Sequence, residues 1–139
     1  MSFLELHDIR KAYTLNHQEN VILKGINLNF ERGEFISILG ESGGGKSTLM
    51  NIIGGLDHHY DGDVLLDGQS LRSMNVRLMD RYRRETIGFI FQNFNLVSYL
   101  TVLDNVMLSL KMTKTSHAQQ VQQAPVSYTH LTLPTTPYV

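Results

Sequence analysis

The first 53 residues of the chain carry two clear strand patterns and one helix pattern. Ile26, Leu28 and Phe30 alternate with polar residues, and this period of two predicts a strand with one buried face. The run 35–39 is short and almost entirely apolar, which predicts a strand buried on both faces. After a glycine cluster, the spacing over 46–53 predicts a helix that ends at the following glycines. The order strand, glycine-rich loop, helix indicates an α/β fold.

The rest of the chain predicts further elements separated by polar segments. Leu4–Tyr13 alternates weakly, and the polar residues 14–20 that follow predict a loop. Thr101 is typical of a helix N-cap, with Asp104 in the first turn, where the helix dipole favours a carboxylate. The remaining expected elements are a strand over 61–68, a helix over 71–85 and a buried strand over 87–91.

The composition excludes some classes of protein but does not by itself identify the function. The chain has 139 residues, of which 42% are hydrophobic, enough for one domain with a buried core. Its net charge of −1 gives no electrostatic argument for nucleic acid or an anionic membrane surface. The absence of cysteine excludes disulfides and thiol chemistry. No apolar run approaches the ~20 residues needed to cross a bilayer, and no secretory signal is recognisable, so we expect a cytoplasmic chain.

The glycine-rich segment carries the chemistry. Residues 40–47 read Gly-Glu-Ser-Gly-Gly-Gly-Lys-Ser and match the phosphate-binding pattern G-x-x-x-x-G-K-[ST]. The glycines let backbone N–H groups turn inward around phosphate oxygens, and the helix that follows adds its N-terminal amides. Lys46 places a charge by the β- and γ-phosphates, and Ser47 offers a hydroxyl to Mg²⁺. The alternative, a flexible glycine linker, does not account for the strand before the loop and the helix after it.

With these motifs in view, the sequence resembles the ATP-binding subunits of ABC transporters. Residues 40–49 match the family's narrower loop, G-x-S-G-x-G-K-S-T-L, and residues 23–28 resemble the strand ahead of it. Residues 87–92 resemble the strand that leads to the family's Q-loop glutamine. Together with residues 100–106, these motifs are most similar in sequence to the macrolide-export and lipoprotein-release subgroup of the family. The resemblance covers residues 3–124.

This resemblance implies a P-loop NTPase fold of ABC type, with ATP and Mg²⁺ as cofactors. The residues that it implies for nucleotide binding are Tyr13, Gly40, Ser42, Gly43, Gly44, Gly45, Lys46, Ser47 and Thr48. Tyr13 would stack on adenine, with an ordinary strand-end tyrosine as the alternative. Lys46 and Gln92 would take part in catalysis, and Ser47 and Gln92 would contact Mg²⁺.

The same resemblance implies partners and a place in the cell. The segment Gln92–Leu96 would contact a transmembrane permease through exposed apolar residues, with burial inside the domain as the alternative. ATP-binding domains would form a homodimer at the inner face of the cell membrane, held there by the permease, and no nucleic acid is expected. The implied function couples ATP binding and hydrolysis to export or extraction of a substrate.

Several parts of such an ATPase have no match between Gln92 and Val139. The family's signature loop, typically L-S-G-G-Q, is missing, as are the apolar strand ending in Asp-Glu and the switch histidine. Phosphoryl transfer depends on positioned groups, so we expect the chain itself to be inactive, a truncated N-terminal portion. The alternative function is a nucleotide-binding fragment that holds Mg-ATP weakly without hydrolysis. An unrelated P-loop switch or kinase would require Tyr13, the loop form and Gln92 all to be coincidental.

The last fifteen residues, 125–139, differ from the rest in holding all three prolines and no charged residue. Residues 126–135 can be encoded by GTC TCT TAT ACA CAT CTG ACG CTG CCG ACG, which resembles the mosaic end and adapter of transposase-based sequencing libraries. We therefore expect residues 1–124 to be the N-terminal part of an ABC ATP-binding domain, comprising its ATP-binding core and the start of its helical subdomain. Residues 125–139 would be a non-native, adapter-derived tail, and synonymous codons that break the adapter string would contradict this.

A pair of histidines and a set of three arginines are not expected to form a metal site or a catalytic site. His58 and His59 have no converging set of metal ligands in the sequence, which predicts a polar loop. Arg81, Arg83 and Arg84 predict a solvated helix face.

Overall fold

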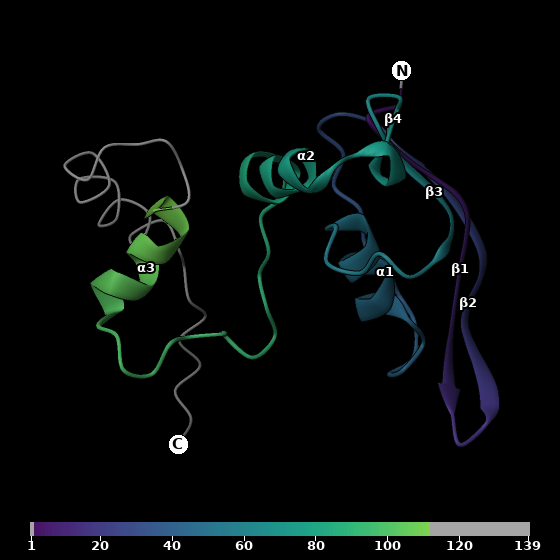
Figure 1. The fold of residues 1–139 in the computed structure, drawn as a ribbon, viewed down its shortest axis with the longest axis horizontal. Helices are drawn as coiled ribbons and strands as arrows, with labels where there is room; N and C mark the ends of the chain where they lie inside the picture. Colours follow the sequence, from purple (N-terminus) through teal and green to yellow (C-terminus); the bar gives the residue numbers. More distant parts are fainter. Residues whose placement is uncertain (1, 112–139) are drawn as a thin grey trace. The chain divides into compact units, whose positions relative to one another are not determined.

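The computed structural model describes residues 2–111, which form two compact units that divide between Ile87 and Gly88 (Figure 1). The first unit contains a sheet and the glycine-rich loop, and the described part of the second, up to residue 111, contains one helix with the segment before it. The predicted tail over 125–139 lies outside the described residues.

A four-stranded antiparallel sheet forms the frame of the first unit, in the order β2-β1-β3-β4. Its strands are β1 (Leu4–Leu15), β2 (Gln18–Phe30), β3 (Asp61–Leu66) and β4 (Gln69–Ser70). The strand predicted to end at Phe30 is confirmed as the last part of β2, and the strand predicted over 61–68 is confirmed as β3. In the central strand, Leu6 pairs with Leu28 on one side and Val64 on the other.

The predicted loop over residues 14–20 is wrong, because β1 and β2 continue through this segment. The strands meet at a two-residue turn, Asn16-His17, between the paired residues Leu15 and Gln18. Both turn residues have positive φ, 50° and 63°, as in a hairpin turn whose twist matches that of its strands. The polar composition therefore reflects a solvent-exposed hairpin end and not a break in the sheet.

The helix α1 (Lys46–Ile53) has both of the ends predicted from the sequence. The single helix predicted over 71–85 is wrong, since three short pieces replace it: η1 (Leu71–Ser73), α2 (Val76–Arg81) and the π-helical η2 (Tyr82–Thr86). Two caps explain the interruption. The Ser70 hydroxyl accepts the Arg72 N–H at 3.2 Å to start η1. The Asn75 side chain accepts the Leu78 N–H at 2.9 Å, which starts α2 afresh.

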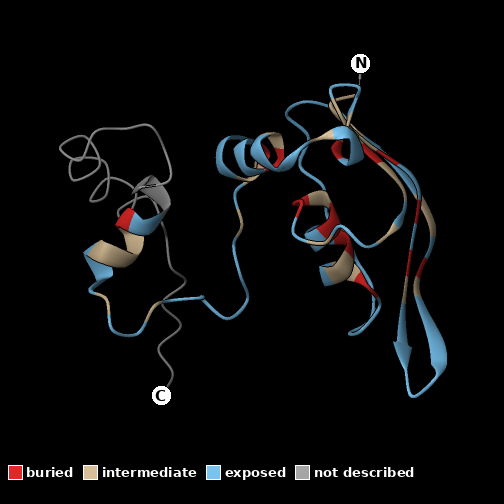
Figure 2. Ribbon diagram, in the orientation of Figure 1, coloured by how far each residue is buried: buried red, intermediate tan, exposed pale blue. Residues whose placement is uncertain are grey.

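The core of the first unit lies between the sheet and α1 (Figure 2). Its fully buried side chains come from both layers: Leu6, Ile9 and Val64 from the sheet and Ile52 from α1. At the edge of the core, the Tyr82 hydroxyl donates to the Ile53 carbonyl at 2.5 Å, and burial raises the pKa of Tyr82 to about 12. This bond fixes the last turn of α1, the helix that follows the glycine-rich loop.

The buried strands predicted over 35–39 and 87–91 are wrong for this structure, since neither segment joins a described strand. Phe35 is 96% exposed, Leu39 91% and Ile90 97%. A strand buried on both faces needs hydrogen-bonded neighbours and covering layers. The described sheet is antiparallel throughout and offers these segments no parallel neighbour, so most of their apolar side chains face solvent, while Ile38 and Ile87 pack against the edge of the core.

In the second unit, α3 (Val102–Lys111) confirms Thr101 as the N-cap. The Thr101 hydroxyl accepts the Asp104 N–H at 3.1 Å and donates to the Asp104 carboxylate at 2.7 Å. The Asn105 side chain binds both backbone groups of Val97, which holds the preceding segment against the helix. Within residues 2–111, no helix combines the length and the apolar character that crossing a membrane would require.

Candidate functional site

The glycine-rich loop has a backbone shape that requires glycine. Gly43 and Gly45 have φ values of +81° and +90°, a region that residues with a Cβ rarely adopt. Between them, the Gly44 N–H donates to the Glu41 carbonyl at 3.1 Å and closes a turn. A Cβ on Gly45 would lie 2.7 Å from Ile22 Cγ2, so glycine also lets the loop pack against β2. Gly43 and Gly45, two of the positions that the family's loop pattern marks as glycine, are therefore positions where the geometry needs it.

Lys46 holds this loop closed from the inside. Its Nζ donates to the Gly40 carbonyl at 2.6 Å and to the Glu41 carbonyl. An ammonium group has three donors, so these two bonds leave capacity for one more acceptor. The positive charge is thus held inside the curve of the loop, in a half-buried side chain.

The start of α1 is open to an anion. Its N-cap is Gly45, which makes no side-chain hydrogen bond, and its first turn contains no acidic residue. The first amides of the helix and the positive end of its dipole therefore point at the loop without a protein carboxylate to balance them. This end of α1 and the Lys46 ammonium together form a phosphate-binding arrangement.

The residues at the start of α1 also fit a magnesium ion bound together with phosphates. Ser47 is exposed and Thr48 is half-buried in the first turn. Mg²⁺ prefers oxygen ligands and keeps several waters, so one protein hydroxyl beside phosphate oxygens is a sufficient protein contribution. Within the described part of the chain, no cluster of three or more His, Asp or Glu side chains could hold a metal without such help.

Tyr13 lies near the end of β1 and is 42% exposed. Lys11 stands two residues earlier, on the same face of the strand, and its ammonium lies 5.0 Å from the centre of the Tyr13 ring. Part of the Tyr13 side chain is open to solvent and could accept a planar base. Sequence reasoning missed Lys11, although its place two residues before Tyr13 in an alternating strand was a signal that could have indicated it.

An ion pair joins this strand to the segment that follows α1. Lys11 is 8% exposed, and its Nζ lies 2.9 Å from the Asp57 carboxylate. Burial by itself raises the pKa of Asp57, but the hydrogen bonds from Lys11 and from the His59 N–H outweigh it, so the pKa lies below the usual 3.8. The segment around His58 and His59 is a polar loop, as predicted.

This ion pair should make stability depend on pH in acid. Because the pKa of Asp57 is lower in the folded chain, its contribution is complete above about pH 4 and is lost as the pH falls through the folded value. Asp57→Asn should therefore lower the free energy of unfolding by about 2–3 kcal/mol at pH 7. Urea unfolding at pH 7 and at pH 3 measures both values, and the difference between the variant and the parent should shrink at pH 3.

The control for this prediction is Asp67→Asn, which removes the carboxylate of an exposed ion pair with Arg32. Exposed pairs contribute roughly 0–1 kcal/mol, so this variant should cost little at either pH. A difference for Asp57→Asn that stays constant from pH 7 to pH 3 would contradict the lowered pKa.

Gln92 belongs to the second unit, so its position relative to the loop is not determined. It lies in an exposed turn with Asn93. Phe94 is 74% exposed and Leu96 69%, so the alternative of burial does not hold for this structure. The role of Gln92–Leu96 as a partner surface stays a prediction.

The prediction that Arg81, Arg83 and Arg84 form a solvated face is wrong for Arg83. Its guanidinium donates to the Gly55 carbonyl at 2.9 Å and to the Asp80 carboxylate at 2.5 Å. This half-buried side chain connects η2 to the turn after α1, and the other two arginines are exposed as predicted.

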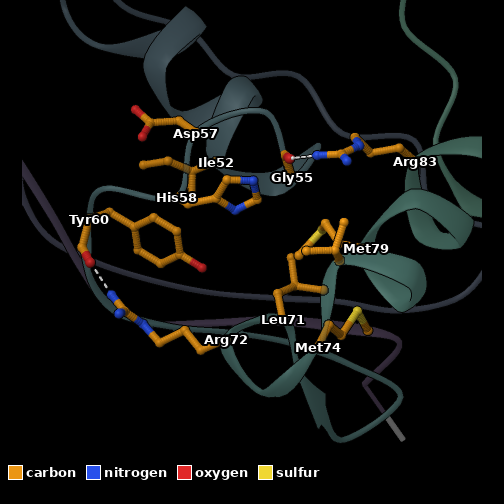
Figure 3. Close-up of a pocket in the computed structure, with 11 residues that line it drawn as sticks. Ile52, Gly55, Asp57, His58, Tyr60, Leu71, Arg72, Met74, Met79 and Arg83 are labelled. Atoms are coloured by element: carbon orange, nitrogen blue, oxygen red, sulfur yellow. Dashed lines mark hydrogen bonds between the residues drawn. The ribbon is translucent and has the colours of Figure 1, made fainter.

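A cavity of about 410 Å³ lies at the opposite end of α1 from the loop (Figure 3). Its wall combines apolar side chains, among them Leu71 and Met79, with Arg72 and Arg83. Both guanidinium groups bind backbone carbonyls of the wall, Arg72 at Tyr60 and Arg83 at Gly55. None of the site residues predicted from the sequence lines this cavity.

Comparison with known proteins shows what the chain is similar to. Residues 23–135 match the family model described as ABC transporter, a match that runs beyond the boundary predicted at residue 124. The chain is 47% identical over 105 residues to the macrolide export ATP-binding/permease protein MacB of Rhodopirellula baltica, covering 76% of this chain and 15% of that protein. It is 38% identical over 114 residues to the bacitracin export ATP-binding protein BceA of Halalkalibacterium halodurans, covering 82% of this chain and 45% of that protein.

Solved structures agree with these matches. The dimeric structure of the ABC transporter cassette MJ0796 of Methanocaldococcus jannaschii has a TM-score of 0.81 and 38% identity, covering 88% of this chain and 54% of that one. A second MJ0796 structure, in a post-hydrolysis state with ADP and Pi, has a TM-score of 0.80. The chain thus spans about half the length of these relatives and less of MacB. Its loop motif, the glycine-dependent loop geometry and these matches show that the chain belongs to the ABC transporter family.

Proposed function

We propose that the first unit binds the triphosphate of ATP, with Mg²⁺, in the loop Gly40–Ser47. The observation that carries the proposal is the Lys46 ammonium held inside the loop beside the uncapped start of α1. Both features place positive charge at one point of the surface without a protein anion to balance it. Phosphate oxygens are the ligands that fit this arrangement.

Each residue of the loop has a distinct part in this proposal. The amides of Gly43 and Gly45 would donate to phosphate oxygens, while the Gly44 amide would keep the turn closed through its bond to the Glu41 carbonyl. Lys46 would use its remaining donor on the terminal phosphates. Ser47 would hold Mg²⁺, which, when bound, supplies charge that stabilises the triphosphate. Gly40 and Ser42 would form the first part of the loop around the phosphates. Thr48 follows Ser47 in the first turn of α1.

The adenine would stack on Tyr13. Tyr13 is 42% exposed near the end of β1, and base stacking on an aromatic ring contributes roughly 1–3 kcal/mol. Since stacking tolerates any base, this contact adds affinity and leaves the choice of base to other groups.

For the whole protein, we infer the ATP-binding subunit of a transporter that couples ATP binding and hydrolysis to export or extraction of a substrate. The names of the relatives MacB and BceA, both exporters, support this inference. Two such domains would pair, as in the dimeric MJ0796 structure. The exposed segment Gln92–Leu96 would contact the permease, which would place the protein at the inner face of the membrane. Gln92 would approach Mg²⁺ and the γ-phosphate.

A competition series tests the binding proposal. Chain 1–139 is titrated in Mg²⁺ with ATP, AMP, adenosine and inorganic tripolyphosphate. We expect tripolyphosphate to displace bound ATP, because the loop recognises the triphosphate. For the same reason, AMP should bind far more weakly than ATP. Binding of adenosine as tight as that of ATP, with no competition from tripolyphosphate, would show that the loop is not the binding site.

A further inference from the structure

Lys11 is the one charged residue that is buried among the described side chains, with 8% exposure. A lysine is costly to remove from water unless its ammonium is paired. Here Nζ meets both Asp57 oxygens, at 3.1 and 2.9 Å, and the His59 carbonyl. Its three donors are therefore matched by oxygen acceptors, all of them on the segment after α1.

That segment is itself bound to α1. The Asp57 N–H donates to the Asn51 carbonyl in the last turn of the helix, at 3.1 Å. The His59 N–H returns to the Asp57 carboxylate at 2.8 Å and fixes its orientation. A group that binds Asp57 is thus bound to the rigid helix whose first turn carries Lys46 and Ser47.

The same ammonium lies over the Tyr13 ring, 5.0 Å from its centre. A cation attracted to the face of a ring restricts the positions that the ring can take. Lys11 therefore contacts both structures that an ATP molecule would have to span: the ring proposed for the base, and, through Asp57, the helix behind the phosphate loop.

We propose that Lys11 is a positioning residue for nucleotide binding, which sets the orientation of the Tyr13 ring and its distance from the phosphate loop. This inference rests on the proposed function of Gly40–Ser47 and Tyr13. Lys11 does not touch the nucleotide. It acts through Tyr13, so its effect should appear only with ligands that carry a base.

The test variant is Lys11→Met combined with Asp57→Asn, because removing Lys11 alone would leave a partly buried carboxylate unpaired. Affinities of chain 1–139 for ATP and for inorganic tripolyphosphate are measured by titration calorimetry. The double variant should bind ATP about fivefold more weakly, as expected from loss of a cation–π contact, and bind tripolyphosphate as the parent does. In a Tyr13→Ala background the same double change should alter ATP affinity by less than about twofold. Lys24→Met, an exposed lysine on β2, is the control and should leave both affinities unchanged.

Each other outcome is informative. An equal loss of affinity for ATP and tripolyphosphate would show a general structural role and overturn the inference, as would unchanged affinity for ATP. A fivefold effect that persists without Tyr13 would show that Lys11 acts by another route and would also overturn it. Failure of the parent chain to bind either ligand would instead contradict the proposed function, and the inference with it.

Discussion

Lys46→Ala should weaken binding of Mg-ATP to chain 1–139 by roughly ten- to hundredfold, the value of a charge-assisted hydrogen bond. Two effects act in the same direction. The variant lacks the ammonium that would meet the terminal phosphates, and it also lacks the two bonds that close the loop on Gly40 and Glu41. Titration calorimetry with ATP and with tripolyphosphate measures the change, and both affinities should fall together because the loss concerns phosphate alone.

Lys24→Ala is the matched control, since it removes an exposed lysine of β2 from the same unit. It should change neither affinity, which separates the local effect of Lys46 from the effect of net charge. Equal affinity of the Lys46 variant and the parent for ATP would mean that the loop does not bind phosphate.

Chain 1–139 should show no ATP turnover above background, more than about a thousandfold below a full-length ABC cassette under the same conditions. The sequence after Gln92 has no match to the signature loop, the Asp-Glu strand or the switch histidine. Without groups to position water and stabilise the transferred phosphoryl, bound ATP should remain intact. Phosphate release is measured with purified chain in excess Mg-ATP.

The control for turnover is Lys46→Ala, because any trace of activity that this variant retains comes from contaminating ATPases. Phosphate release by the parent chain within about tenfold of a full-length cassette would contradict the expectation of an inactive chain. ATP binding without turnover would support the alternative of a nucleotide-binding fragment for this polypeptide.

The parts of the fold that sequence predicts well are those determined locally. The helix α1 follows a glycine-rich loop and stops at glycines, so the residues next to the helix determine both of its ends. The N-cap at Thr101 is local in the same way. The run 35–39 failed as a predicted strand because a strand depends on partners elsewhere in the chain, and the described sheet has none for it.

In the candidate site, too, the features determined by neighbouring residues were predicted and those that depend on distant residues were not. The phosphate loop was predicted from eight consecutive residues, and its glycine conformations agree with the pattern. The ion pair of Lys11 with Asp57 joins residues 46 positions apart and leaves no local signal, so it emerged only from the structure. The Asn16-His17 turn shows the opposite error, since local polarity suggested a loop where pairing extends the sheet.

The central claim is that the triphosphate binds at Gly40–Ser47, and mapping of backbone amides by nuclear magnetic resonance tests it most directly. Isotope-labelled chain 1–139 is titrated with Mg-ATP, and the change of each amide shift is followed. The largest changes should fall on the amides from Gly43 to Thr48, with smaller ones around Tyr13. Changes confined to the cavity near Leu71 and Met79, with the loop amides unmoved, would contradict the claim.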